Sequence, residues 1–315
     1  MKSKQSISAL MSGFALSCAI FCVSNQVFAG SILDDDEFKS NRAVIQQELQ
    51  NGRGNLQTAN VYLDDQKLKH PEFTYFKVVD ATPLQTAAVF TDFYDFEGDA
   101  LLHGTGLNVS DLMEGPGTTH QRVRFAYDSS SLYNGIPGSA DFYIQEFMLR
   151  QPVDGAYHVD VKFLKSSAFY VPGEKGATFG SYESMVFEPY GDGKTLVAFT
   201  VYLEPKDVFM AKAEPTYSGT EVYPLRVEHL ANYTRQLKLN EGKDKGKLER
   251  LTQGYSASLR NDQILPQFNY RDSKWIEDVY ADNFASGNWV DPDYEKKVHE
   301  NMAWKSQLKR FFGSN

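Results

Sequence analysis

Alternation of apolar and polar residues predicts a series of β-strands through the middle of the chain. The clearest example is Val123, Phe125 and Tyr127, which alternate with Arg122, Arg124 and Ala126. The segments that show strand patterns are 72–81, 122–127, 140–149, 157–164, 178–187 and 195–203. Several are joined by short Gly- or Pro-containing turns, a spacing that is typical of an antiparallel meander.

Three segments change to helical spacing. An acidic start at 34–37 opens a helix that ends before Gly52, and Thr82-Pro83 offers an N-cap and a first helical position. Val222, Leu225, Leu230, Tyr233 and Leu237 then follow one face of a long helix. The charged segment 241–247 predicts a break, and a looser apolar stripe over 294–312 predicts further helix. The Gly-rich segment 98–117 is interpreted as loop.

The first 29 residues have the three parts of a secretory signal peptide. Lys2 and Lys4 form a positive start, residues 7–23 are mostly apolar, and residues 27–29 offer a small-residue cleavage site. We expect cleavage near Ala29-Gly30 and a periplasmic or secreted protein. An uncleaved membrane anchor is the alternative, although the apolar run is short for a membrane span.

Composition and motifs exclude several classes of function. The chain carries 32 Lys and Arg against 41 Asp and Glu, which argues against general nucleic-acid binding. Cys18 and Cys22 both lie in the expected signal peptide, so a mature chain would have no disulfides and no cysteine ligands. Neither an HExxH nor a GxSxG motif occurs, and the six histidines show no paired metal spacing. We therefore expect no metal and no cofactor, and we name no catalytic residue.

The junction of the first strand and helix resembles a known superfamily. The residues are Val78-Val79-Asp80-Ala81-Thr82-Pro83, followed by 87–93, and the order of elements over 72–239 extends the match. Both resemble the START/polyketide-cyclase-like (SRPBCC) superfamily. The resemblance implies an α+β helix-grip fold, an antiparallel sheet wrapped round a long C-terminal helix, here with extra helical flanks. We divide the chain into a signal peptide (1–29), an N-terminal flank (30–71), a ligand-binding domain (72–240) and a C-terminal extension (241–315).

In this superfamily the grip leaves an apolar cavity, which implies a lipid or another apolar small molecule as ligand. The inward-facing candidates are Phe125, Tyr127, Ile144, Glu146, Val161, Phe163, Glu183, Met185 and Tyr202. Glu146 and Glu183 are in phase with apolar neighbours, and a buried carboxylate needs a polar ligand headgroup or an Arg partner. The alternative is a reversed register in which both carboxylates face water.

We expect an exported protein that binds, and in one version transports, an apolar ligand. One alternative is an enzyme of the cyclase or lyase type on the same fold. Another is an interaction protein whose interior is filled by its own side chains. Residues 305–312 combine basic and aromatic side chains, a pattern that suits contact with a membrane surface. Docking of this helix on its own domain would explain the same pattern.

Overall fold

A computed structural model describes residues 31–34, 36–60, 71–93, 107–128, 140–166, 169–177, 180–206, 220, 222–242 and 245–265. The expected signal peptide and the apolar stripe over 294–312 lie outside these ranges. The centre is an eight-stranded sheet in the order β1-β2-β8-β7-β6-β5-β4-β3. The strands are β1 (Asn55–Asn60), β2 (Pro71–Val79), β3 (Leu107–Glu114), β4 (His120–Asp128), β5 (Ala140–Leu149), β6 (Tyr157–Ser166), β7 (Tyr182–Pro189) and β8 (Thr195–Tyr202). Every neighbouring pair is antiparallel, so the expected meander is confirmed.

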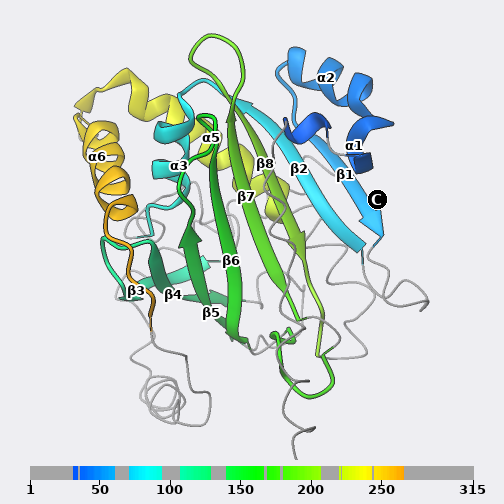
Figure 1. The fold of residues 1–315 in the computed structure, drawn as a ribbon, viewed down its shortest axis with the longest axis vertical. Coiled ribbons are helices and arrows are strands. Elements are labelled where there is room, and N and C mark those ends of the chain that lie inside the picture. Colours follow the sequence, from blue (N-terminus) through cyan, green and yellow to red (C-terminus); the bar gives the residue numbers. More distant parts are fainter. Residues whose placement is uncertain are drawn as a thin grey trace, which may run out of the picture.

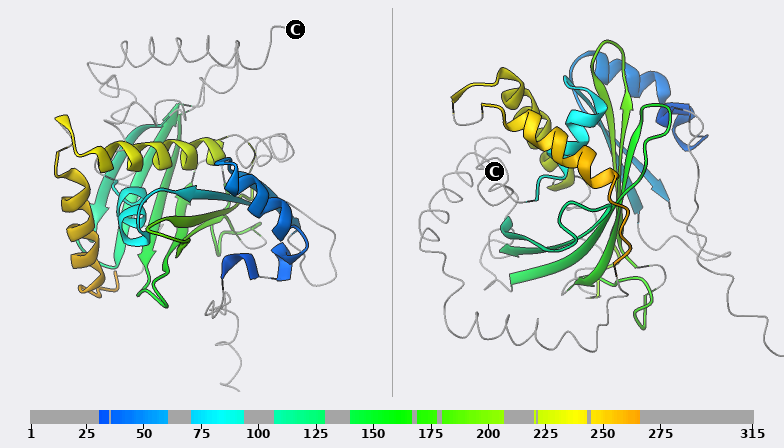
Figure 2. Two further views of the ribbon diagram at one scale, coloured as in Figure 1. Left: turned by 90° about the horizontal axis from the view of Figure 1, so that it is seen from above. Right: turned by 60° about the vertical axis from the view of Figure 1, so that its left-hand side comes forward.

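Helices cover the two faces of this sheet differently. The helices of the N-terminal part are η1 (Ile32–Asp34), α1 (Asp36–Lys39) and α2 (Arg42–Gln50). They lie on one face, whereas α3 (Pro83–Phe90), α5 (Tyr223–Leu239) and α6 (Lys247–Leu259) lie on the other (Figure 1). The sheet curves round this second group, as the right-hand view of Figure 2 shows. We call the side of α3, α5 and α6 the inner face and the opposite side the outer face. The expected α+β helix-grip class is therefore confirmed.

Helix α3 begins where the sequence predicts. The Thr82 side chain accepts a hydrogen bond from the backbone of Gln85, and the Gln85 side chain accepts one from the Thr82 backbone. Pro83 follows at the first helical position, where a missing N–H has no consequence. This capping box fixes the turn from β2 into α3. It thereby places the apolar residues of α3 against the inner face, where Phe90 meets the ring of Phe187 edge-on at 5.4 Å.

Two apolar clusters hold these layers together. The larger lies on the inner face and joins alternate residues of β2 and β4–β8 to α3, α5 and α6. The smaller lies on the outer face, where Ile32, Leu33, Ile45 and Leu49 pack near Phe76 of β2 and residues of β8. Strand β8 is buried on both faces, which explains its nearly continuous apolar sequence.

Both flanks of the expected domain pack against the same sheet. Strand β1 lies before residue 72 and pairs with β2, with Leu56 opposite Tyr75. Helix α6 lies after residue 240 and contributes Tyr255 and Leu259 to the inner cluster. Within the described ranges, no helix is long and apolar enough to cross a membrane.

Candidate functional site

Five of the nine candidate residues share the inner face of the sheet. Phe125, Val161, Phe163, Glu183 and Met185 are all at most 2% exposed. Val161 pairs with Glu183 across β6 and β7, which places both side chains on one face. The backbone of Tyr127 belongs to β4, in phase with Phe125, but its side chain lies outside the described part.

The other three candidates point to the outer face, contrary to the prediction. Phe125 pairs with Tyr143, so Tyr143 faces inward and its neighbour Ile144 faces outward. Glu146 follows Ile144 on the outer face for the same reason. On β8 it is Val201 that pairs with Glu183, which turns Tyr202 outward. Tyr202 is nevertheless buried, and its ring stacks on Tyr182 at 5.4 Å.

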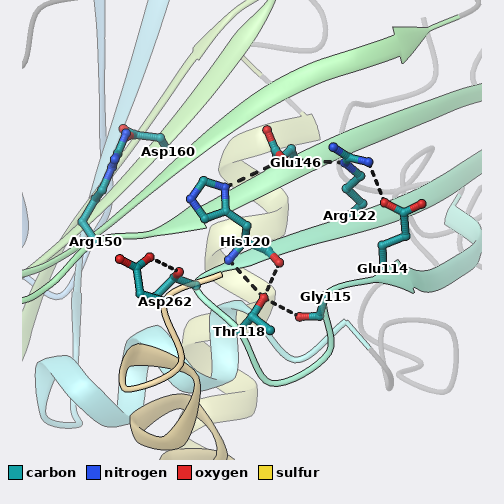
Figure 3. Close-up of polar contacts among 10 residues, drawn as sticks. Glu114, Gly115, Thr118, His120, Arg122, Glu146, Arg150, Asp160 and Asp262 are labelled. Carbon is teal, nitrogen blue, oxygen red and sulfur yellow. Dashed lines mark hydrogen bonds and ion pairs between the residues drawn. The ribbon is translucent and has the colours of Figure 1, made fainter. Parts of the chain in front are cut away.

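Glu146 belongs to a polar network on the outer face (Figure 3). Its Oε1 lies 3.6 Å from Arg122 Nε and 3.8 Å from His120 Nδ1. Arg122 also binds Glu114 of β3, with 2.6 Å between Nη1 and Oε2. Half of the Glu114 side chain is exposed, so this network reaches solvent. Its charges are paired across β3, β4 and β5, and they lie on the side of the sheet opposite α3, α5 and α6.

Glu183 is the one carboxylate of the candidate set that faces inward, and its side chain is 1% exposed. Its Oε1 accepts hydrogen bonds from Gln145 Nε2 of β5 at 2.9 Å and from the Tyr223 hydroxyl of α5 at 2.6 Å. Its Oε2 lies 3.7 Å from Arg226 Nη1, also on α5, and has no hydrogen bond. Of the two expected compensations for a buried carboxylate, a polar headgroup or an Arg partner, the Arg partner is present at Glu183.

Aromatic rings surround the Arg226 side of this pair. The guanidinium carbon lies 6.0 Å from the ring centre of Phe125 and 5.6 Å from that of Phe199. Phe199 also packs against the ring of Tyr223 at 5.4 Å. A guanidinium is stabilised over aromatic faces when water is excluded. The sheet and α5 therefore enclose the charges of Glu183 and Arg226 beside these rings, and we call these two residues the inner charge pair.

Sequence reasoning missed Arg226, Tyr223 and Gln145. Arg226 is in helical phase with Leu230, Thr234 and Leu237, and all of these are buried on α5. That spacing is the signal that could have identified it, because an Arg in phase with a buried stripe requires a partner. Gln145 occupies an inward position of β5 between Tyr143 and Phe147, where alternation alone indicates burial.

Tyrosine hydroxyls near the inner face are held in their neutral form. Burial raises the pKa of Tyr75, and its hydrogen bond to Glu228 on α5 raises it further. Burial also raises the pKa of Tyr255 on α6. Among the described residues, no group of three or more His, Cys, Asp or Glu could hold a metal ion. Among the described residues, the inner face offers apolar contact, the inner charge pair, and a second ion pair between Lys77 of β2 and Glu228 of α5 at 2.8 Å.

Comparisons with known proteins concern the fold. No protein-family model matches the sequence, and no curated protein matches it. Solved structures that match this chain include START proteins. A STAR-related lipid transfer protein fragment from Xanthomonas axonopodis is 16% identical, with a TM-score of 0.44, over 58% of this chain and 94% of that one. Human STARD10 is 11% identical, with a TM-score of 0.41, over 70% and 89%. A START superfamily protein from Mycobacterium smegmatis is 13% identical, with a TM-score of 0.38, over 53% and 98%.

Proposed function

We propose that this protein binds an apolar molecule with one neutral polar end, held between the inner face of the sheet and α5. The observation that carries the proposal is the inner charge pair. Glu183 and Arg226 lie among aromatic rings, and Glu183 Oε2 has no hydrogen bond. A buried acceptor without a donor is costly, and native structures seldom keep one without a role.

The chemistry of the pair favours a hydroxyl or a similar neutral group. A hydroxyl donates to Glu183 Oε2 and can also accept from a guanidinium N–H. A ligand carboxylate would be attracted by Arg226 but repelled by Glu183. A ligand ammonium would be attracted by Glu183 but repelled by Arg226. An apolar tail would lie against the rings of the inner face, in line with ligand sites that are mostly apolar with few polar groups.

The proposal includes export. The first 29 residues have the pattern of a signal peptide and lie outside the described part, so their sequence alone supports this step. An exported carrier would move an apolar molecule through an aqueous compartment. Without Lys2 and Lys4 such a carrier has 30 Lys and Arg against 41 Asp and Glu, a formal net charge of −11, which favours its solubility.

Native mass spectrometry of the chain, purified without detergent, is the first test. We expect an adduct that solvent extraction releases as an apolar molecule. The delipidated protein is then incubated with oleyl alcohol, oleic acid or oleylamine, which share one tail and differ in the polar end. We expect oleyl alcohol to bind about tenfold more tightly than either charged ligand, because one unsatisfied or repelled group is worth about 1.4 kcal/mol or more.

Variants connect this preference to the inner charge pair. Glu183→Gln removes the negative charge and leaves Arg226, so we expect it to bind oleic acid more tightly than oleyl alcohol. The matched control is Glu249→Gln, because Glu249 is exposed on α6 and bonded to Gln253. The control should keep the wild-type order of the three ligands. An unchanged apo mass with all three ligands would overturn the proposal and favour a protein whose interior is filled by its own side chains.

A further inference from the structure

The two carboxylate oxygens of Glu183 have different surroundings. Oε1 accepts hydrogen bonds from Gln145 Nε2 at 2.9 Å and from the Tyr223 hydroxyl at 2.6 Å. Oε2 is buried without a hydrogen bond, and Arg226 Nη1 lies 3.7 Å from it, which is longer than a hydrogen bond. An ionised carboxylate has about four positions for donors, two on each oxygen. Oε1 is therefore filled, and the positions that remain are on Oε2.

Gln145 reaches Glu183 across an intervening strand. Gln145 belongs to β5 and Glu183 to β7, and β6 lies between these two strands. On β6, Phe163 pairs with Gln145 and Val161 pairs with Glu183. Because neighbouring strands are about 4.8 Å apart, only two long side chains can meet above the strand between them. The sheet thus supplies one of the two donors to Oε1 by itself.

Tyr223 supplies the other donor from the first turn of α5. It is the first residue of this helix, and its ring packs against Phe199 of β8 at 5.4 Å. From this ring the hydroxyl reaches Glu183 Oε1. The packing of the ring does not depend on the hydroxyl. A phenylalanine at this position would therefore keep the ring contact and open one position on Oε1.

We infer that Tyr223 and Gln145 determine specificity by restricting the ligand to one donating hydroxyl, an inference that rests on the proposed function. The two residues fill Glu183 Oε1, and the Arg226 guanidinium lies beside Oε2. One ligand hydroxyl can donate to Oε2. A vicinal diol brings a second hydroxyl that finds Oε1 already occupied, and a buried hydroxyl without a partner weakens binding. The class of ligand is an apolar molecule whose polar end is a single hydroxyl, and vicinal diols are disfavoured.

Three ligands with the same alkyl chain test this restriction. They are 1-hexadecanol, 1,2-hexadecanediol and 2-methoxyhexadecan-1-ol, of which the last is about as bulky as the diol but has only one donor. Two ligands at equal concentration compete for the delipidated chain, and native mass spectrometry gives the ratio of the two adducts. For the wild-type chain we expect 1-hexadecanol to bind about tenfold more tightly than the diol.

Tyr223→Phe and Gln145→Met each remove one donor from Glu183 Oε1 and keep a side chain of similar size. The opened position accepts the second hydroxyl of the diol, so each variant should bind the diol at least as tightly as 1-hexadecanol. The ratio of the two adducts then changes by about tenfold or more. The methoxy compound should gain nothing relative to 1-hexadecanol, because it has no second hydroxyl to donate. A general loosening of the fold would instead affect all three ligands alike.

Tyr75→Phe is the matched control. The Tyr75 hydroxyl of β2 donates to Glu228 Oε1 of α5 at 2.8 Å, so this variant also loses one hydrogen bond between α5 and the sheet. That hydrogen bond does not involve Glu183, and the control should keep the wild-type ratio of adducts. Urea unfolding establishes that each variant is folded before its ligands are compared. If one of the two test variants does not fold, the other decides.

Two outcomes would overturn this inference and leave the proposed function in place. One is a wild-type chain that binds the diol as tightly as 1-hexadecanol. The other is a folded Tyr223→Phe or Gln145→Met variant that keeps the wild-type preference. If the wild-type chain forms no adduct with any of the three ligands, the proposed function itself fails.

Discussion

Removal of either member of the inner charge pair should destabilise the protein more than removal of both. The relevant variants are Arg226→Met, Glu183→Met and the double variant. The side chains of Glu183 and Arg226 are 1% and 9% exposed, so water screens their interaction little. In Arg226→Met the carboxylate keeps its two hydrogen bonds, from Gln145 and Tyr223. In Glu183→Met the guanidinium loses its ion partner, and the two donors, Gln145 and Tyr223, lose this acceptor.

These differences set the expected magnitudes. Breaking a buried pair by removing one partner costs about 3–5 kcal/mol. Arg226→Met belongs at the lower end, about 3 kcal/mol, because Glu183 stays hydrogen-bonded. Glu183→Met belongs at the upper end, about 5 kcal/mol, because a charge and two donors lose a partner. The double variant removes both charges and leaves only the two neutral donors, so it should lose about 2 kcal/mol.

Equilibrium urea unfolding at pH 7, followed by far-ultraviolet circular dichroism, measures all four free energies of unfolding. Arg150→Met is the control, because the Arg150–Asp160 pair is 47% and 30% exposed and should be worth less than about 1 kcal/mol. Additive losses in the double variant would show that the two charges do not interact, and the reasoning on the inner site would fail. Single-variant losses as small as that of the control would refute the burial of the pair.

Three further predictions concern single positions. Gly54→Ala should destabilise by about 1–3 kcal/mol in urea unfolding, because the new Cβ would lie 1.9 Å from the Tyr75 hydroxyl and force that ring to move. Thr82→Ala should lose about 1 kcal/mol by removing the side-chain acceptor of the capping box, whereas Thr82→Ser should not. Burial acts to raise the pKa of Asp160. The hydrogen bonds and charges of His158 and Arg150 outweigh this effect and lower the pKa below its ordinary value. Its stabilising contribution is therefore present above about pH 4 and lost as pH falls, so the difference between Asp160→Asn and wild type should close below that pH.

Local patterns predicted most elements of the fold because the relevant forces act over a few residues. The strand predicted over 140–149 is β5, with the same bounds. The helix predicted from Thr82-Pro83 is α3, since a capping box is determined by two residues that lie three positions apart, here Thr82 and Gln85. Strand β3 was interpreted as loop. It lies in a Gly-rich segment, and its pairing with β4 is irregular near Val109 and near Glu114. These irregularities interrupt the alternation of apolar and polar residues by which a strand is predicted.

The sequence predicted in part which candidate residues face inward, and the two errors on β5 have one cause. Ile144 and Glu146 were assigned to the inner face because β5 carries apolar residues on both faces. A shift of one residue then reverses every side chain, and only pairing with β4 fixes the phase. Glu183 was assigned correctly, and its partner Arg226 was missed. That partner lies 43 positions away on a helix, and this contact is set by how α5 crosses the sheet.

Buried polar groups occur on both faces of the sheet. On the outer face, Glu188 receives hydrogen bonds from the Ser31 hydroxyl at 2.7 Å and the Ile32 backbone at 2.8 Å, which fixes η1 on an apolar cluster. On the inner side, Glu183 Oε2 and the Tyr255 hydroxyl are both buried without a hydrogen bond. Folding alone would favour satisfying these two groups or replacing them with apolar ones. Because Glu183 Oε2 belongs to the proposed ligand contact, its lack of a hydrogen bond is consistent with an inner face that is completed by a ligand.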